Sequence, residues 1–224
     1  MAVITVDFDG TLFTGDSFKV MVKVAMKEFT TEQWKTTFKG IGKAVTVGLS
    51  KGKDTFKLQF FRAFAGGFRG ESKQALNDFF QKLVKVGKHK INQELVTTVK
   101  NHQQNGDAVI VVSGAFTPFL EVFTREIGLD VPIISTQLLF DDQDICTDVG
   151  TVINGQEKVK KVQAWLEKAK QDGTITAEAA EDIWAYADSK SDIPLFEFAN
   201  RPVIVNPNGT MKEIAAKKNW PVML

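Results

Sequence analysis

The sequence has little of what marks secreted, membrane-spanning or nucleic-acid-binding proteins. Its single cysteine, Cys146, cannot form an internal disulfide, which fits a reducing compartment. No apolar run approaches the ~20 residues that cross a bilayer, and the run from Ala2 to Val6 is too short for the apolar region of a signal peptide. The 28 Lys and Arg nearly balance the 27 Asp and Glu, which argues against a general nucleic-acid binder. We expect a cytoplasmic protein that binds neither membrane nor nucleic acid.

Four short, β-branched apolar runs predict the strands of a parallel sheet. Each run is continuous rather than alternating, as expected of strands that are buried on both faces. Helical stretches separate the last three runs, and this alternation is typical of an α/β fold. The four runs are Val3–Val6, Ala108–Val112, Ile183–Ala187 and Pro202–Val205.

The spacing between the first two runs indicates an insertion. Asp7 and Ser113, which follow these runs, lie 106 positions apart, whereas a crossover between parallel strands needs only about a dozen residues. Residues 17–86 have the pattern of several amphipathic helices. We therefore predict an α/β core of residues 1–16 and 87–224, with a helical cap subdomain at 17–86.

Local signals mark where some of the helices begin. The segment from Thr30 to Gln33 has the form of a capping box. A crossover helix is predicted from Ile91 to about Gln104. Thr117 fits an N-cap position and Pro118 the first helical position.

Two aspartates follow the first run. Asp7 and Asp9 are two positions apart at the end of an extended segment, so both carboxylates project from the same side. Close carboxylates repel each other unless a cation or a shared proton is present. Mg²⁺ prefers carboxylate oxygens and also binds phosphate. The alternative is a pair of solvated turn aspartates before a glycine.

A polar loop follows the second run. Ser113 and Gly114 lead into a helix N-terminus, where free N–H groups and the helix dipole favour an anion. The Ser113 hydroxyl and the Gly114 N–H could both donate to a phosphate oxygen. The alternative is an ordinary strand-to-helix turn.

Further charged residues would complete such a site. Asp188 directly follows the third strand, and Asp192 lies at the start of the next helix. The carboxyl ends of the strands are where open α/β sheets bind ligands. A phosphate among carboxylates needs positive charge, which Lys158 could supply, although Lys160 and Lys161 lie beside it and all three could be a solvated face.

Taken in order, these residues resemble the four motifs of the haloacid dehalogenase superfamily of phosphohydrolases. The resemblance is to subfamily IB, the phosphoserine-phosphatase-like group with a helical cap between the first and second motifs. It spans nearly the whole chain, although Ala187 stands where glycine is common in the superfamily. The motif residues are Asp7-Phe8-Asp9-Gly10-Thr11, Ser113-Gly114, Lys158, and Asp188 with Asp192.

The resemblance implies a Rossmann-like three-layer core and a Mg²⁺-dependent phosphomonoesterase acting on a small phosphorylated metabolite. Asp7 would attack phosphorus and carry an aspartyl-phosphate. Asp9 would protonate the leaving alcohol and later activate water. Asp7, the backbone carbonyl of Asp9, and Asp188 would hold the metal. The phosphoryl oxygens would be held by Thr11, Ser113, Gly114 and Lys158, with Asp192 positioning Lys158 or a metal-bound water.

Three alternatives share parts of this pattern. A phosphorylated signalling receiver also gathers acids around Mg²⁺, but it has no use for a 70-residue insertion or for an acid two residues past the acceptor. A non-catalytic protein of this fold is disfavoured because every expected catalytic residue is present. A phosphotransferase or phosphomutase would pass the phosphoryl group to another acceptor, and the sequence leaves that alternative open.

The sequence identifies neither the substrate nor the oligomeric state. Aromatic residues at helical spacing within 17–86 are interpreted as the cap's own core rather than as substrate contacts. Asp16 lies close enough to Asp7 to face the site, but it could equally cap the helix that follows. The aromatic residues are Phe18, Trp34, Phe38, Phe56, Phe60, Phe61, Phe64 and Phe68.

Overall fold

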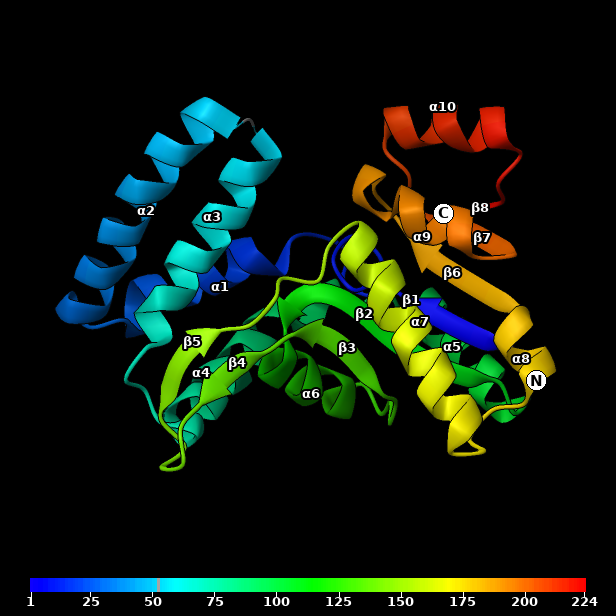
Figure 1. The fold of residues 1–224 in the computed structure, drawn as a ribbon, viewed down its shortest axis with the longest axis horizontal. Helices are drawn as coiled ribbons and strands as arrows, with labels where there is room; N and C mark the ends of the chain where they lie inside the picture. Colours follow the sequence, from blue (N-terminus) through cyan, green and yellow to red (C-terminus); the bar gives the residue numbers. More distant parts are fainter. Residues whose placement is uncertain (52) are drawn as a thin grey trace.

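The computed structural model describes residues 1–51 and 53–224, and the side chains outside 46–57. Its central sheet has six strands in the order β3-β2-β1-β6-β7-β8, and every neighbouring pair is parallel (Figure 1). From β1 the chain adds β2 and then β3 on one side of the sheet, and from β6 it adds β7 and then β8 on the other side. The strand order therefore reverses between β1 and β6, and such a switch point is where open α/β sheets bind ligands. The strands are β1 Val3–Val6, β2 Ala108–Phe116, β3 Ile133–Thr136, β6 Ile183–Ala187, β7 Arg201–Val205 and β8 Val222–Met223.

Helices cover both faces of the sheet, which gives the three layers expected of the fold (Figure 1). Successive strand side chains point to opposite faces, so Ile4 packs with Val99 and Leu120 under one helical layer. Val3 packs with Val162 under the other. The helices are α5 Gln93–Gln104 and α6 Thr117–Glu126 on the first face, and α7 Gln156–Gln171, α8 Ala177–Glu181, α9 Ile193–Phe198 and α10 Gly209–Lys218 on the second.

The predicted strands are confirmed, with differences at their ends. β2 continues past Val112 to Phe116. Its register against β3 shifts after Ser113, but pairing resumes at Phe116, which is opposite Thr136. The sequence did not predict the two edge strands of the sheet, β3 and β8. It also did not predict a separate antiparallel pair, β4 Leu138–Phe140 and β5 Cys146–Val149.

Two predicted helix starts are wrong by one or two residues. α5 begins at Gln93, because the Asn92 side chain accepts the N–H of Leu95 and caps the helix there. Thr117 is already helical and Phe116 occupies the cap position. The Thr117 hydroxyl instead contacts the Ser135 hydroxyl at 2.7 Å, so it links α6 to β3.

The described part of residues 17–87 forms four α-helices, where the sequence predicted several helices. α1 spans Ser17–Glu28, α2 Thr31–Lys51, α3 Lys53–Ala65 and α4 Lys73–Gly87. The capping box of α2 is confirmed: the Thr30 N–H donates to Gln33 Oε1 at 2.7 Å, and the Gln33 N–H donates to Thr30 Oγ1 at 3.3 Å. In Figure 1, α2 and α3 lie side by side and project away from the sheet, whereas α4 lies against α6 of the core.

Aromatic rings hold the inserted helices together. Phe29 stacks on Phe64 and meets Phe68 and Phe79 edge-on or tilted, at centroid distances of 5.4–5.7 Å. These rings belong to the same buried cluster as the core residues under α5 and α6. The division of the chain at residues 16 and 87 therefore stays a prediction. The Phe56 side chain lies outside the described residues.

Among the described helices, none combines the length and apolar character that a bilayer span requires.

Candidate active site

A buried ion-pair cluster lies at the switch point between β1 and β6. Asp7, the first residue after β1, continues the strand pairing because its N–H donates to the Tyr186 carbonyl at 2.8 Å. The whole residue is only 4 % exposed, and its Oδ1 lies 2.6 Å from Lys158 Nζ. Its Oδ2 accepts a hydrogen bond from Thr11 Oγ1 at 3.3 Å. Asp7 is therefore held in one orientation from two sides.

Lys158 bridges two carboxylates. Its Nζ lies 2.6 Å from Asp7 Oδ1 and 2.6 Å from Asp192 Oδ1. Lys160 instead pairs with Glu157 on the exposed face of α7, and Lys161 is exposed as well. The three lysines thus lie on different faces of α7, and of the three only Lys158 reaches the cluster.

Two loop residues complete the far side of the cluster. Asp188 follows β6, and Ser189 donates from its hydroxyl to Asp192 Oδ2 at 2.6 Å. Gly10 faces Asp188 so closely that a Cβ at that position would lie 2.1 Å from Asp188 Oδ2. Gly10 also has a φ of +80°, a conformation that glycine adopts without strain.

The loop after β1 brings the start of α1 to Asp9. The Gly10 N–H donates to the carbonyls of Phe13 and Gly15, so the chain folds back on itself. Asp9 Oδ1 then accepts the Ser17 N–H at 2.5 Å, and Oδ2 accepts the Ser17 hydroxyl at 3.0 Å. Asp9 lines the same cavity as Asp7, as predicted, but its carboxylate is held by α1 rather than by the lysine.

Burial changes the ionisation of these groups. It raises the pKa of Asp7 to about 6, against the opposing charge of Lys158. Burial and the charges of Asp7 and Asp192 raise the pKa of Asp188 to about 7. Burial also raises the pKa of Asp9 to about 7. Burial would lower the pKa of Lys158, but the carboxylates of Asp192 and Asp7 raise it well above its usual range.

The charge balance of the cluster fits a divalent cation. One oxygen from each of Asp7, Asp188 and Asp192 lies within 4.8 Å of the others. Among the described residues, the cation paired with this group is Lys158, which contacts Asp7 and Asp192. Carboxylate oxygens are the ligands of hard cations such as Mg²⁺. A bound cation would offset the repulsion between these carboxylates, which adds to the effect of burial on the pKa of Asp7 and of Asp188.

The end of β2 forms the opposite wall. Ser113 Oγ accepts the Ala115 N–H at 3.1 Å, which leaves its own proton available for donation. The Gly114 carbonyl accepts the Thr136 hydroxyl at 2.8 Å, and that hydroxyl accepts the Ile153 N–H at 3.2 Å. A Cβ on Gly114 would lie 3.2 Å from the Ile153 carbonyl, so the loop before α7 packs closely here.

These walls enclose a cavity of about 330 Å³. Thr11 is the exception among the predicted site residues: it is fully buried, and its hydroxyl bonds Asp7 instead of facing the cavity. Sequence reasoning assigned no role to Asn154, Ser189 or Ser191, which also line it. The two serines lie between Asp188 and Asp192 in the sequence, and this position would have been enough to predict that they lie at the site. The predicted residues lining the cavity are Asp7, Asp9, Ser113, Gly114, Lys158, Asp188 and Asp192.

Comparisons with known proteins identify the family of this chain. The family model described as haloacid dehalogenase-like hydrolase matches residues 4–197. A histidinol-phosphatase of Neisseria meningitidis is 30% identical over 131 residues, which are 56% of this chain and 55% of that protein. A "probable phosphatase" of Mycobacterium tuberculosis is 26% identical over 130 residues, or 58% and 42% of the two chains. The chain thus spans about half the length of the curated relatives it matches.

Solved structures share the fold over the whole chain. A protein of unknown function from Bordetella pertussis has a TM-score of 0.75 at 20% identity, covering 100% of this chain and 97% of that one. A "probable phosphoserine phosphatase" from Vibrio cholerae has a TM-score of 0.60 at 18% identity, covering 96% and 58%. At these identities the likeness shows the fold alone.

Proposed function

The chain belongs to the haloacid dehalogenase-like hydrolase family, and we propose that it is a Mg²⁺-dependent phosphomonoesterase for a small phosphorylated metabolite. The observation that carries the proposal is the placement of Asp7, Asp9 and Lys158 around one cavity. A nucleophile, a proton donor and a positive charge are the groups that phosphoryl transfer to water needs. The relatives named as phosphatases support the same reaction class.

Asp7 is the nucleophile. A carboxylate oxygen of Asp7 forms a bond to phosphorus while the bond from phosphorus to the ester oxygen breaks, which leaves an aspartyl-phosphate and an alcohol. The hydrogen bond from Thr11 holds Oδ2, so Oδ1 and Oδ2 are not equivalent before attack. This assigns Thr11 to orienting Asp7 rather than to holding phosphate.

Asp9 moves the protons. It gives its proton to the departing ester oxygen, and it then takes a proton from the water that attacks phosphorus and regenerates Asp7. A pKa of about 7 suits both roles, because an acid and its base are then both populated near neutral pH. Ser17 donates two hydrogen bonds to this carboxylate, which fixes its position relative to Asp7.

Lys158, Ser113 and the Gly114 N–H stabilise the charge on the phosphoryl oxygens during transfer. Lys158 is held for this role by Asp192, whose other oxygen is in turn held by Ser189. Asp192 is therefore a positioning residue.

Mg²⁺ would be held by Asp7 and Asp188, together with the backbone carbonyl of Asp9. When bound, it supplies a positive charge that offsets the charge of the phosphoryl group and of these carboxylates.

A metal-dependence assay tests the proposal. Release of inorganic phosphate from acetyl phosphate and from an aryl phosphate should stop on chelation and return on addition of Mg²⁺. Asp7→Asn should abolish release, whereas Asp182→Asn should not, because Asp182 pairs with Arg201 beyond the opposite end of β6. Hydrolysis that persists after complete metal removal, or that survives Asp7→Asn, contradicts the proposal. A panel including O-phospho-L-serine and histidinol phosphate would rank the substrates.

A further inference from the structure

A second cavity adjoins the proposed catalytic cavity and has no role in the reaction described above. It has a volume of about 490 Å³ and lies between the inserted helices and the junction of β2 with α6. Its volume lies in the range of small-molecule binding sites. Asp9, Asp16, Gly114, Asn154 and Ser191 line both cavities, so one molecule can occupy the two at once.

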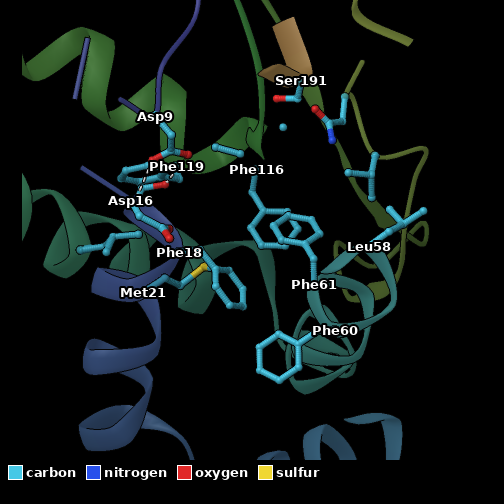
Figure 2. Close-up of a pocket in the computed structure, with 16 residues that line it drawn as sticks. Asp9, Asp16, Phe18, Met21, Leu58, Phe60, Phe61, Phe116, Phe119 and Ser191 are labelled. Atoms are coloured by element: carbon cyan, nitrogen blue, oxygen red, sulfur yellow. Dashed lines mark hydrogen bonds between the residues drawn. The ribbon is translucent and has the colours of Figure 1, made fainter. Parts of the chain in front are cut away.

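The wall of this second cavity is mainly apolar. In Figure 2 the rings of Phe60 and Phe61 lie at the end away from Asp9 and Ser191, with Phe18 and Met21 across from them. Phe60 and Phe61 come from α3, whereas Phe18 and Met21 come from α1.

The aromatic wall packs against a buried ring of the core. Phe116 is 1 % exposed and stacks on Phe61 with ring centroids 4.5 Å apart and planes at 20°. Phe18 meets Phe61 at 5.7 Å. Phe18 and Phe61 are only half-buried, so a ligand in the cavity would remove further apolar surface from water. Removal of apolar surface from water is favourable in proportion to its area.

The cavity offers carboxyl groups and no basic side chain. Among the described residues that line it, Asp9 and Asp16 are acidic, and none is a lysine, arginine or histidine. A ligand carboxylate in this cavity would lose water without gaining a cationic partner among these described residues, which is costly. It would also face the carboxylate of Asp16.

From these observations we propose that this cavity holds the alcohol part of the substrate, and that this alcohol has an aromatic or aliphatic body and no carboxylate. The inference rests on the proposed function, because it takes the phosphate to lie beside Asp7 and Lys158. It places O-phospho-L-serine outside the preferred substrate class.

A graded set of phosphate monoesters tests the inference. The esters are 2-phenylethyl phosphate, ethyl phosphate, O-phosphoethanolamine and O-phospho-L-serine, the last two differing only by a carboxylate. We expect kcat/KM for 2-phenylethyl phosphate to exceed that for O-phospho-L-serine by about 100-fold, with O-phosphoethanolamine above O-phospho-L-serine by about tenfold. Equal or faster hydrolysis of O-phospho-L-serine overturns the inference.

Variants of the aromatic wall provide a second test. Phe61→Ala should lower kcat/KM for 2-phenylethyl phosphate about tenfold and should leave hydrolysis of acetyl phosphate, which is too small to fill the cavity, within about twofold. Phe61→Leu keeps an apolar side chain and should restore most of the loss. Phe38→Ala is the matched control, because Phe38 is 62 % exposed, stacks on Trp34 and lies outside the cavity.

The same assays separate the two proposals. If acetyl phosphate is hydrolysed with Mg²⁺ but Phe61→Ala affects all esters equally, the cavity does not bind the alcohol and the inference fails alone. If none of the phosphates is hydrolysed, the proposed function itself fails.

Discussion

Asp7 and Asp9 are two residues apart, yet the fold gives their carboxylates different partners. Asp7 contacts a buried lysine, whereas Asp9 accepts two hydrogen bonds from Ser17. The first environment stabilises an anion that can attack, and the second holds a group that exchanges protons. Their functions should therefore separate on mutation.

Asp7→Asn should form no phosphoenzyme, because the amide is a poor nucleophile. Asp9→Asn should still form it from an activated aryl phosphate, which needs little protonation of its leaving group, but should hydrolyse it slowly. Rapid-quench measurement of acid-precipitable phosphate would then find label in the Asp9→Asn protein alone. Equal labelling of the two variants would overturn this division of roles.

Gly10 should tolerate no side chain. Gly10→Ala would place a methyl group 2.1 Å from Asp188 Oδ2 and would also strain a backbone with φ +80°. The matched control is Gly106→Ala, since Gly106 has φ +81° but open space around its Cβ position. Both variants should lose about 1–2 kcal/mol of stability from backbone strain, whereas Gly10→Ala alone should lose activity and Mg²⁺ affinity. Thermal melts and metal titration would distinguish them, and full activity of Gly10→Ala would contradict the site geometry.

Asp16 both caps α1 and lines the two cavities, so the two interpretations of it are compatible. Its side chain accepts the Lys19 N–H at 3.2 Å. Asp16→Ala should lower stability by roughly 0.5–2 kcal/mol, whereas Asp16→Asn keeps a good capping group. Asp16→Asn should nevertheless raise kcat/KM for O-phospho-L-serine relative to O-phosphoethanolamine, because it removes a negative charge facing the alcohol. An unchanged ratio in Asp16→Asn would remove this charge from substrate selection.

At the scale of elements, one carboxylate ties the end of α5 to two strands. Asp107 accepts the Ala2 N–H at 2.8 Å and lies 2.8 Å from His102 Nδ1, while His102 Nε2 lies 3.0 Å from the Tyr186 hydroxyl. Although burial opposes it, the hydrogen bonds from His102 and Ala2 hold the pKa of Asp107 below its usual value. The ionised carboxylate therefore stabilises the fold above about pH 4, and this contribution is lost as the pH falls through the lowered pKa.

Asp107→Asn should thus lower the free energy of unfolding by about 1–2 kcal/mol near neutral pH. The difference from the unmodified protein should shrink on acidification, because protonation of Asp107 in the unmodified protein removes the anion that the variant already lacks. Denaturant melts between about pH 7 and pH 3 would measure it. A difference that stays constant with pH would show that packing, not charge, carries the effect.

The elements that the sequence predicted are those with a strong local pattern. β1 and β6 are continuous apolar runs, and their observed bounds match the predicted ones. The β4–β5 pair has strands of only three and four residues, and β5 contains Thr147 and Asp148, so it does not form a continuous apolar run as β1 does. It is held from outside, because the Cys146 N–H donates to the Glu71 carbonyl and the Cys146 carbonyl accepts the Gly70 N–H.

The residues of the site also divide into those that a local sequence pattern predicts and those that depend on distant parts of the chain. Asp7 and Asp9 could be predicted because they are close in sequence and follow a strand. Lys158 could not be separated from its neighbours, since its partners Asp7 and Asp192 lie 151 and 34 positions away. The aromatic cavity was beyond prediction for a similar reason: its rings come from α1, α3, the end of β2 and α6, and each ring alone matches a core position.

At the scale of the whole molecule, residues 17–65 and the rest of the chain carry net charges of opposite sign. Residues 17–65, which include α1, α2 and α3, hold ten of the 28 Lys and Arg but only three of the 27 Asp and Glu. Their net charge is therefore +7, and that of all other residues is −6. The near neutrality of the sequence as a whole hides this separation.

This separation of charge makes the molecule an electric dipole, and its positive segment adjoins the second cavity because α1 and α3 line that cavity. A phosphate dianion diffusing nearby would be attracted to this positive segment and repelled by the negatively charged remainder of the molecule, which raises the encounter rate.

Added salt screens such a field over about 10 Å at 0.1 M, so kcat/KM should fall several-fold between low and moderate ionic strength. Lys35→Glu with Lys39→Glu on α2 should flatten that dependence, whereas Lys212→Glu with Lys217→Glu on α10 should steepen it or leave it unchanged. The helices that shape the substrate cavity would then also set how often a substrate arrives.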